Sequence, residues 1–450
     1  MGDDLVIPVA DDGLGNSAYL VDLGDGRALA VDPSRDLRAV DAEAARRGLA
    51  IAVTAETHLH ADFLSGSTRL AARDRATVLA SAAGRREFTH TPLSDGDEVG
   101  LAGLTLRAWA TPGHTPEHLA YLLCDGTRVL GVFTGGSLIA GAAARTDLTS
   151  SELTEPLAHD QFRSLHRLTE LPGGTPVYPT HGAGSFCAAA PGGEHTTTIG
   201  REKAANPLLQ VSDEDGFVAA LLAGNGSFPP YFRRLAGVNR RGPAVPADDP
   251  VLAPLTVAQV RRLRADGADV IDVRQASGYA AGHIPDALAV PLRGAFATWV
   301  GWLVPDPATA LVIVRDSGQD PDEIIWQLLK IGHGNLAGEL AGGMRAWTDA
   351  GQTVRATPRY SPGAIHPRQI IDVRQSGEYA AGHLPGAENI ELGSLPDADL
   401  PHGPVMVMCE RGDRATTAAS VLERAGLGDV TVLAGSADAW ARAAGQAVVS

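Results

Sequence analysis

The feature that most constrains the fold is an internal repeat in the second half of the chain. The segment Ile-Asp-Val-Arg-Gln at 271–275 returns at 371–375, a displacement of 100 positions (371 − 271). The segment Tyr-Ala-Ala-Gly-His then follows in both copies, at 279–283 and 379–383. Such a repeat indicates a duplicated domain. Each copy is predicted to be a small doubly wound α/β domain around a central parallel sheet.

Length and linker composition divide the chain further. Its 450 residues correspond to about three domains at roughly 150 residues each. Proline, glycine and charged residues displace the apolar pattern at 239–250, and a shorter break lies at 357–363. We therefore expect domains at 1–240, 253–355 and 362–450.

Charge and composition exclude several classes of function. A net charge of −16 argues against binding to nucleic acid. The sequence holds no run of about 18 apolar residues, and its start lacks a cationic segment followed by an apolar one, so no membrane association is expected. The three cysteines are far apart and form no disulfide framework, which favours a cytoplasmic location.

Cys409 lies where a thiolate becomes reactive. It follows the apolar run 405–408 and precedes a helical pattern that begins near Ala415. Amide hydrogens and the positive end of a helix dipole stabilise negative sulfur at such a position, and Arg411 and Arg414 add positive charge. The alternative is a buried structural cysteine.

The spacing of Cys409, Gly412 and Arg414 resembles the active-site loop of rhodanese sulfurtransferases, as do the Asp-Val-Arg and Gly-His-Leu-Pro-Gly-Ala segments upstream. The resemblance implies that Cys409 carries a persulfide in the loop that contains Gly412. Arg411 and Arg414 would attract thiosulfate or a similar anionic sulfur donor, although Arg414 could instead brace the loop. In the first copy Arg315 stands where Cys409 stands, so this copy is predicted to be a structural or docking domain.

The first 240 residues carry a second group of chemically active residues. His58 and His60 are two positions apart, so they point the same way from an extended segment, as ligands of one metal ion would. Asp62 follows them, and further histidines come at Thr-Pro-Gly-His114 and Pro-Thr-His181. These five residues are the candidate ligands of one metal ion.

This region resembles the metallo-β-lactamase fold, and within it the persulfide dioxygenases that occur fused to rhodanese domains. The resemblance implies an αββα sandwich of two mixed sheets between helices. It also implies one Fe(II), with Zn(II) as the alternative, held by two histidines that match His58 and His114 and by an aspartate. The implied substrate is a low-molecular-weight thiol persulfide.

Two positions depart from the family pattern. Gly136 stands where the family has the aspartate ligand, and Phe63 replaces a histidine that binds a second metal ion. A two-metal hydrolase of the glyoxalase II type is therefore a disfavoured alternative. A second alternative is a sulfur-binding protein whose N-terminal pocket is a metal-free relict, in which the histidines hydrogen-bond to one another. If the site has only lost a ligand, the change Gly136→Asp should restore it.

Three further residues are candidate substrate contacts. Arg145 and Asp147 keep an Arg-Thr-Asp segment of the dioxygenases, and Cys187 lies six residues after His181 in a glycine-rich loop. Alternatively, Arg145 and Asp147 pair on a loop and Cys187 is a small buried apolar residue. A second copy of the chain is a further candidate partner.

Overall fold

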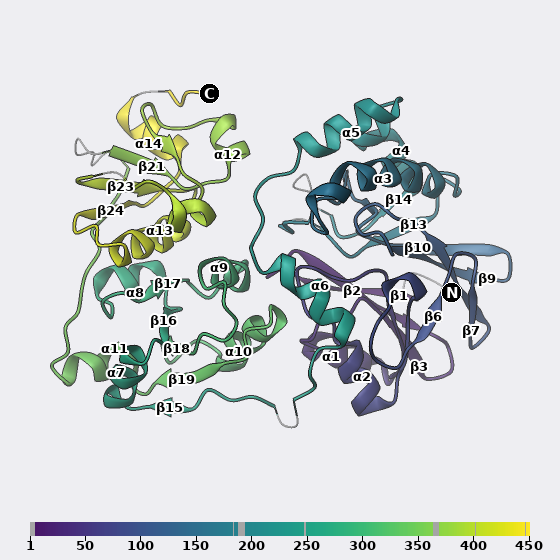
Figure 1. Ribbon diagram of the computed structural model, residues 1–450, viewed down its shortest axis with the longest axis horizontal. Coiled ribbons are helices and arrows are strands. Elements are labelled where there is room, and N and C mark those ends of the chain that lie inside the picture. The colour runs from purple at the N-terminus through teal and green to yellow at the C-terminus, as the bar shows by residue number, and fades with distance from the viewer. Residues whose placement is uncertain are drawn as a thin grey trace. The chain divides into compact units, whose positions relative to one another are not determined.

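The computed structural model describes residues 5–182, 184–187, 194–246, 249–362, 369–400, 402–445 and 447–450. The chain divides into two compact units, 1–248 with the segment 329–332, and 249–328 with 333–450. Figure 1 colours the chain from purple at its N-terminus to yellow at its C-terminus. No helix among the described residues is long and apolar enough to cross a membrane.

The N-terminal unit is built on two mixed six-stranded sheets (Figure 1). The first sheet runs in chain order: β1 (Val6–Asp11), β2 (Asn16–Asp22), β3 (Arg27–Val31), β4 (Ala50–Glu56), β5 (Thr77–Ser81) and β6 (Thr91–Leu93). The second has the order β14 (Thr197–Thr198), β13 (Pro176–Pro179), β10 (Arg128–Gly135), β9 (Leu119–Asp125), β8 (Leu104–Ala110) and β7 (Glu98–Leu101). A hairpin of β11 (Leu138–Ile139) and β12 (Ala142–Ala143) follows β10.

Alternation along the strands explains how the sheets stack. In β9, Leu119, Tyr121 and Leu123 point into a core shared by both sheets. The residues that alternate with them, Ala120, Leu122 and Cys124, pack on the helical side instead. This period of two is what a strand with both faces buried requires. The predicted αββα sandwich is confirmed, and Cys124 belongs to its core.

Helices cover the outer faces of the two sheets. Residues of α1 and α2 share a core with the first sheet, and residues of α3 and α5 share one with the second. The helices of this unit are α1 (Arg38–Arg47), α2 (Ser67–Asp74), α3 (Thr154–Leu168), α4 (Ile199–Ala205), α5 (Glu214–Ala223) and α6 (Phe232–Arg241). Short 3₁₀ turns lie at η1 (Ala82–Gly84), η2 (Ser151–Leu153) and η3 (Pro207–Gln210).

The second unit contains two parallel five-stranded sheets with the same strand order, as the repeat predicts. The first has the order β15 (Pro254–Leu255), β19 (Leu336–Leu340), β18 (Leu311–Val314), β16 (Asp269–Asp272) and β17 (Leu288–Ala289). The second has β20 (Arg359–Tyr360), β24 (Val430–Leu433), β23 (Val405–Met408), β21 (Gln369–Asp372) and β22 (Glu388–Asn389). The two copies of the repeated Ile-Asp-Val-Arg segment lie on β16 and β21.

Helices alternate with these strands. In the first repeat they are α7 (Val257–Ala265), α8 (Ala276–Ala281), α9 (Phe296–Leu303), α10 (Pro321–Lys330) and α11 (Gly343–Asp349). In the second they are α12 (Ser376–Ala381), the 3₁₀ turn η4 (Leu392–Asp397), α13 (Asp413–Arg424) and α14 (Ala437–Ala444). The predicted α/β class is therefore confirmed for both copies.

Helix α13 of the second repeat is buried along most of its length because the first repeat also packs against it. Ser420 accepts a hydrogen bond from the Ala289 amide at 3.0 Å. At the far end of the helix, Glu423 accepts bonds from the Thr357 hydroxyl at 2.6 Å and from His283 at 3.1 Å. At its start, Arg293 forms an ion pair with Asp413 at 3.2 Å. The first repeat thus holds α13 from one end to the other.

Candidate metal centre and cysteine loop

The predicted metal ligands meet at one edge of the N-terminal sandwich because each follows the end of a strand. His58 and His60 come after β4, His114 after β8, and His181 after β13. All four imidazoles are buried, with exposures of 0 to 1%. The ring centroids of His58 and His114 lie 4.8 Å apart, and those of His58 and His181 lie 5.3 Å apart. The fold therefore gathers histidines that are far apart in the sequence.

Asp32, at the end of β3, fixes the protonation of His58. The Thr57 hydroxyl donates its single proton to Asp32 at 2.6 Å, so it can only accept from His58 Nδ1, which lies 2.8 Å away. Although burial opposes ionisation, hydrogen bonds and the His60 ring hold the pKa of Asp32 at about 2. Asp32 is therefore a carboxylate, and His58 carries its hydrogen on Nδ1 and a lone pair on Nε2.

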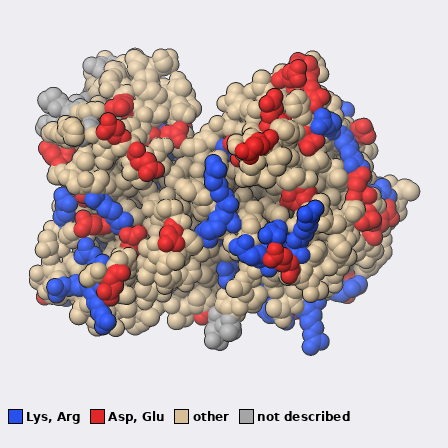
Figure 2. Space-filling view, in the orientation of Figure 1, with Lys and Arg blue, Asp and Glu red and all other residues tan. Residues whose placement is uncertain are grey.

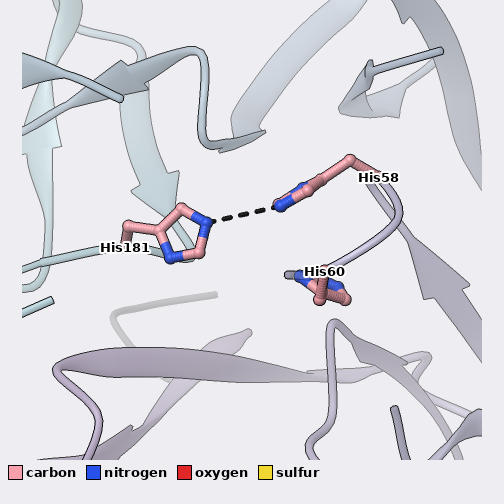
Figure 3. Close-up of side chains that lie close together, drawn as sticks. All are labelled: His58, His60 and His181. Atoms are coloured by element: carbon pink, nitrogen blue, oxygen red, sulfur yellow. Dashed lines mark hydrogen bonds between the residues drawn. The ribbon is translucent and has the colours of Figure 1, made fainter. Parts of the chain in front are cut away.

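His181 has the same arrangement. Its Nδ1 donates to the Asn16 side-chain oxygen at 2.9 Å, since the Asn16 amide nitrogen donates to Asp62 at 2.8 Å. The lone pair of His181 is therefore on Nε2, and this atom faces His58 Nε2 at 3.3 Å (Figure 3). Burial lowers the pKa of His181 to about 3 and that of His58 well below its usual value. A proton between the two rings is thus disfavoured.

His60 adds a third imidazole to the cluster. Its Nε2 lies 3.2 Å from Asp32, while its Nδ1 is buried and has no hydrogen-bond partner among the described residues. Burial disfavours the charged ring, but the Asp32 carboxylate outweighs burial and raises the pKa of His60. Phe63, which replaces a family histidine, stacks on this ring with centroids 4.2 Å apart. One nitrogen each of His58, His60 and His181 lie within 4.8 Å of one another.

His114 fills the space that an aspartate at position 136 would need. A Cβ atom on Gly136 would lie 2.2 Å from His114 Cδ2 and 2.7 Å from its Cγ. The ring is fixed there because its Nδ1 donates to the Arg145 carbonyl at 2.7 Å. Its Nε2 is buried without a partner in the described part of the chain, and burial lowers its pKa to about 3. The expectation that Gly136→Asp restores the family ligand set conflicts with this packing.

These nitrogens fit a metal ion, although position 136 supplies no carboxylate ligand. Two lone pairs that face each other at 3.3 Å repel unless a cation lies between them, and two further imidazole nitrogens are buried without partners among the described residues. Burying such groups unpaired is costly. Each ring also donates its other hydrogen to an oxygen, which is the usual support of a metal-binding histidine. The candidate donors are therefore mainly imidazoles, of which His58, His114 and His181 are neutral, and imidazole suits Zn(II) and Fe(II).

Asp62 and Cys187 lie beside the histidines. One oxygen of Asp62 accepts from Asn16, and the other is buried without a partner among the described residues. Cys187 is buried, and its sulfur lies within 4.8 Å of a nitrogen of His114 and one of His181. Burial and the nearby Asp62 raise the pKa of the Cys187 thiol well above its usual value. The thiol therefore faces the histidine cluster in its protonated form.

Arg145 and Asp147 bind each other. The guanidinium donates two hydrogen bonds to the carboxylate at 2.6 and 2.7 Å, and two more to the carbonyls of Phe186 and Gly226. This arrangement matches the alternative prediction, in which Arg145 and Asp147 pair with each other on a loop instead of binding substrate. Their expected contact with substrate stays a prediction that this geometry does not favour.

Cys409 directly follows β23, and its sulfur caps the start of α13. Its Sγ accepts hydrogen bonds from the amides of Gly412 at 3.1 Å and Ala415 at 3.3 Å. Gly412 has a φ of +91°, a left-handed conformation that favours glycine. The loop thus turns backbone amides toward the sulfur, an arrangement that stabilises a thiolate.

The two arginines of this loop differ in their surroundings. Arg411 is exposed. Arg414 donates to both oxygens of Glu378 at 2.6 and 2.8 Å. Arg414 therefore braces the loop as one alternative predicted, although its partner is a carboxylate rather than backbone carbonyls.

The matching loop of the first repeat has lost this geometry. Arg315 follows β18 in the place of Cys409 and forms an ion pair with Glu339. Six residues, 315–320, separate β18 from α10, whereas four residues, 409–412, separate β23 from α13. The backbone amides at the start of α10 consequently lie two positions farther from Arg315 along the chain than those of α13 lie from Cys409.

Comparisons with known proteins agree with the division of the chain into an N-terminal unit with the histidine cluster and a C-terminal half with the repeated domain. The family model of the rhodanese-like domain matches residues 256–350 and 361–443. Over 181 residues the chain is 33% identical to a hydroxyacylglutathione hydrolase of Parasynechococcus marenigrum, covering 39% of this chain and 68% of that protein. Over 192 residues it is 28% identical to the mitochondrial persulfide dioxygenase ETHE1 of Homo sapiens, covering 42% and 68%.

A solved structure supports the same assignment. A metallo-β-lactamase from Staphylococcus aureus matches with a TM-score of 0.66 at 25% identity, covering 75% of this chain and 98% of that one. The chain belongs to the metallo-β-lactamase-fold family. Its C-terminal half adds two rhodanese-like domains, so the predicted fusion is confirmed. This metallo-β-lactamase–rhodanese chain spans about two thirds of the length of the curated relatives it matches.

The sequence analysis did not identify three polar residues that support the candidate metal centre. Asp32 accepts from Thr57 and His60, Asn16 positions His181, and His118 accepts from the Gly136 amide at 3.0 Å. Asp32 directly follows the apolar strand β3, and this position at a strand end was the available signal. Asn16 and His118 carried no comparable signal, because nothing nearby in the sequence marks them.

Proposed function

We propose that this chain is an enzyme of sulfur metabolism that transfers sulfane sulfur through a persulfide on Cys409. The observation that carries the proposal is the pair of amides, from Gly412 and Ala415, that donate to Cys409 Sγ at the start of α13. A persulfide anion at this position would be stabilised by the same amides. The rhodanese-like match to 361–443 supports the assignment.

The transfer consists of two displacements. The Cys409 thiolate attacks the outer sulfur of thiosulfate, so a sulfur–sulfur bond forms on Cys409 while the donor's own bond breaks and its electron pair leaves with sulfite. The thiolate of an acceptor then attacks the outer sulfur of Cys409. The acceptor becomes a persulfide, and Cys409 leaves as a thiolate. The exposed Arg411 would attract the anionic donor.

We further infer that the N-terminal centre binds one metal ion and acts on a low-molecular-weight thiol persulfide. His58, His60 and His181 would hold the ion, with His114 beside them. A bound Fe(II) would supply the capacity to bind and reduce O₂, whereas Zn(II) would supply only Lewis acidity. Cys187 faces the same cluster and is the candidate thiol acceptor of sulfur. The similarity to the persulfide dioxygenase ETHE1 supports this substrate class.

The main rival is a thioester hydrolase, since hydroxyacylglutathione hydrolases are also similar to this chain. A second metal ion would lack two ligands here, because Phe63 and Gly136 offer none. The other rival is a metal-free relict pocket whose histidines bond to one another. In that case the contact between His58 and His181 would need a hydrogen, which Thr57 and Asn16 direct to the other nitrogens.

Metal content separates these functions. After anaerobic loading with Fe(II), Zn(II) or Mn(II), we expect one ion per wild-type chain by elemental analysis. The variant His181→Gln should lose it, while the surface control His166→Gln should keep it. Two ions per chain would favour the hydrolase, and a metal-free protein would favour the relict pocket. Oxygen uptake upon addition of a thiol persulfide then tests the oxidation itself.

Sulfur transfer is tested separately. Wild-type protein should transfer sulfur from thiosulfate to a thiol acceptor, and Cys409→Ser should abolish transfer without unfolding the chain. The matched control is Cys124→Ser, a change at a core cysteine far from the loop in sequence. Transfer by Cys409→Ser near the wild-type rate would overturn the proposal.

A further inference from the structure

Lys330 is a buried lysine of the N-terminal unit. It is the last residue of α10, and the segment 329–332 belongs to the same compact unit as residues 1–248. Figure 2 shows basic side chains, in blue, spread over the surface, as expected for groups that lose hydration when they are buried. The Lys330 side chain, by contrast, is only 2% exposed. A buried ammonium group requires a partner, and the partner indicates what the lysine does.

The side chain of Lys330 holds the turn that leads to Asn16. Its ammonium group pairs with Asp11, the last residue of β1. Asp11 lies opposite Asn16 in the hairpin of β1 and β2, and it also accepts hydrogen bonds from amides within the turn. Asn16 in turn accepts from His181 Nδ1 and donates to Asp62. The ion pair therefore supports the residue that positions one candidate ligand.

The main chain of Lys330 holds a second loop of the centre. Its carbonyl accepts from the Leu64 amide at 2.7 Å. Leu64 ends the loop that begins with the candidate ligand residues after β4. The Asn239 side chain fixes the same loop, since it donates to the carbonyls of His60 and Phe63, both at 2.8 Å. One residue, Lys330, thus bonds both to this loop and to the hairpin turn.

The segment around Lys330 is itself held against α6. Ile331 is fully buried, and its carbonyl accepts from the Arg234 guanidinium at 3.2 Å. Gly332 has a φ of +84°, a left-handed conformation that favours glycine. A Cβ atom there would lie 3.0 Å from Arg234 Nη1 and 3.3 Å from Leu235 Cδ2. Lys330 therefore presents its ammonium group and its carbonyl from a fixed position.

We propose that Lys330 is a positioning residue of the candidate metal centre, which acts through the turn before Asn16 and through the loop that ends at Leu64. This inference rests on the proposed metal binding by the N-terminal unit, and it adds a residue that contacts no ligand directly. Asn16 determines which nitrogen of His181 keeps its lone pair. Loss of such outer support weakens metal binding because the ligand is no longer held in one tautomer and orientation.

Metal affinity gives the first test. In the full chain, Lys330→Met keeps the apolar stem and removes the charge, and Asp11 can then be hydrated because its side chain is 22% exposed. The variant should therefore fold. We expect its dissociation constant for Zn(II), measured by competition with a chelator, to rise about tenfold. Lys203→Met, at the chain's other lysine, which is exposed, is the matched control and should leave the constant unchanged.

A second variant tests the ion pair itself. Asp11→Asn keeps an oxygen that accepts from the ammonium group but removes the carboxylate charge, so it should weaken Zn(II) binding in the same direction. Lys330→Met and Asp11→Asn together should weaken binding no more than Lys330→Met alone, because the two residues act through one contact. Fully additive losses would contradict the pairing.

A third readout needs no metal ion. In metal-free protein labelled with ¹⁵N in histidine, His181 should carry its hydrogen on Nδ1, because this atom donates to Asn16. In Lys330→Met, NMR should show a mixture of both tautomers of His181. An unchanged tautomer in this variant would overturn the inference, whether or not the wild-type protein binds a metal ion. A tautomer that depends on Lys330 in a protein that binds no metal would support the positioning role and contradict the proposed metal binding.

The control variant separates positioning from general damage. A rise in the dissociation constant that Lys203→Met shares with Lys330→Met would also overturn the inference.

Discussion

Gly136 shows how one missing side chain changes a ligand set. The family's aspartate is absent, and the His114 ring occupies the space where its Cβ would be. Other imidazoles lie close to His58, because His181 Nε2 is 3.3 Å from His58 Nε2. The candidate centre is thus a cluster of histidines beside Asp62, and position 136 supplies no carboxylate.

This packing predicts that Gly136→Asp damages the centre. A side chain at 136 must displace His114 from its bond to the Arg145 carbonyl, and overpacking of this kind costs about 1–3 kcal/mol of unfolding free energy. Chemical denaturation and metal titration would measure both effects. Gly100→Ala, at a site with open space, is the control. Tighter Fe(II) binding by Gly136→Asp would contradict the account.

Some residues of the site could be predicted from sequence, and others could not. Cys409 was predictable because the features that activate it, a strand before it and a helix after it, are local. His58, His60, His114 and His181 were recognisable from their loops. The roles of Asp32 and Asn16 depend on contacts across the sheet, 25 and 165 positions away along the chain, which no local pattern records.

At the scale of elements, α13 depends on the degenerate repeat. Glu423, near its end, accepts from His283 of the first repeat and from Thr357 of the segment that joins the repeats, and the side chain is 7% exposed. The repeat in the sequence predicted that both copies have the same fold, and the matching strand order of the two sheets confirms this. It could not show that one copy packs along helix α13 of the other, because a sequence pattern within one domain carries no information on packing between domains.

We therefore expect Glu423→Ala to lower the unfolding free energy of the full chain by about 2–3 kcal/mol, since His283 and Thr357 would be left buried without their partner. Sulfur transfer should also slow, because the helix that presents the Ala415 amide to Cys409 loses support. Denaturation and transfer kinetics measure the two effects. Glu388→Ala, at an exposed strand residue, is the control. Equal stability of the two variants would contradict this role of the first repeat.

At the scale of the whole molecule, only one of the two repeats is expected to carry sulfur. Arg315→Cys places a cysteine after β18, but the loop there has six residues rather than four, and no amide geometry like that of Cys409 results. In a Cys409→Ser background, we expect Arg315→Cys to restore no transfer from thiosulfate. Restored transfer would show that the loop length is unimportant and that the first repeat is a latent sulfurtransferase.

The chain as a whole combines a histidine cluster in the metallo-β-lactamase-fold unit with a cysteine loop in the last rhodanese-like domain, and we propose that both act in sulfur chemistry. The central claim is that Cys409 forms a persulfide. It is tested most directly by mass spectrometry of the peptide containing Cys409 after incubation of the full chain with thiosulfate. The account predicts the addition of one sulfur atom to that peptide, its loss upon treatment with a thiol, and no addition to the Cys124 peptide. An unmodified Cys409 peptide in protein that nevertheless transfers sulfur would contradict the account.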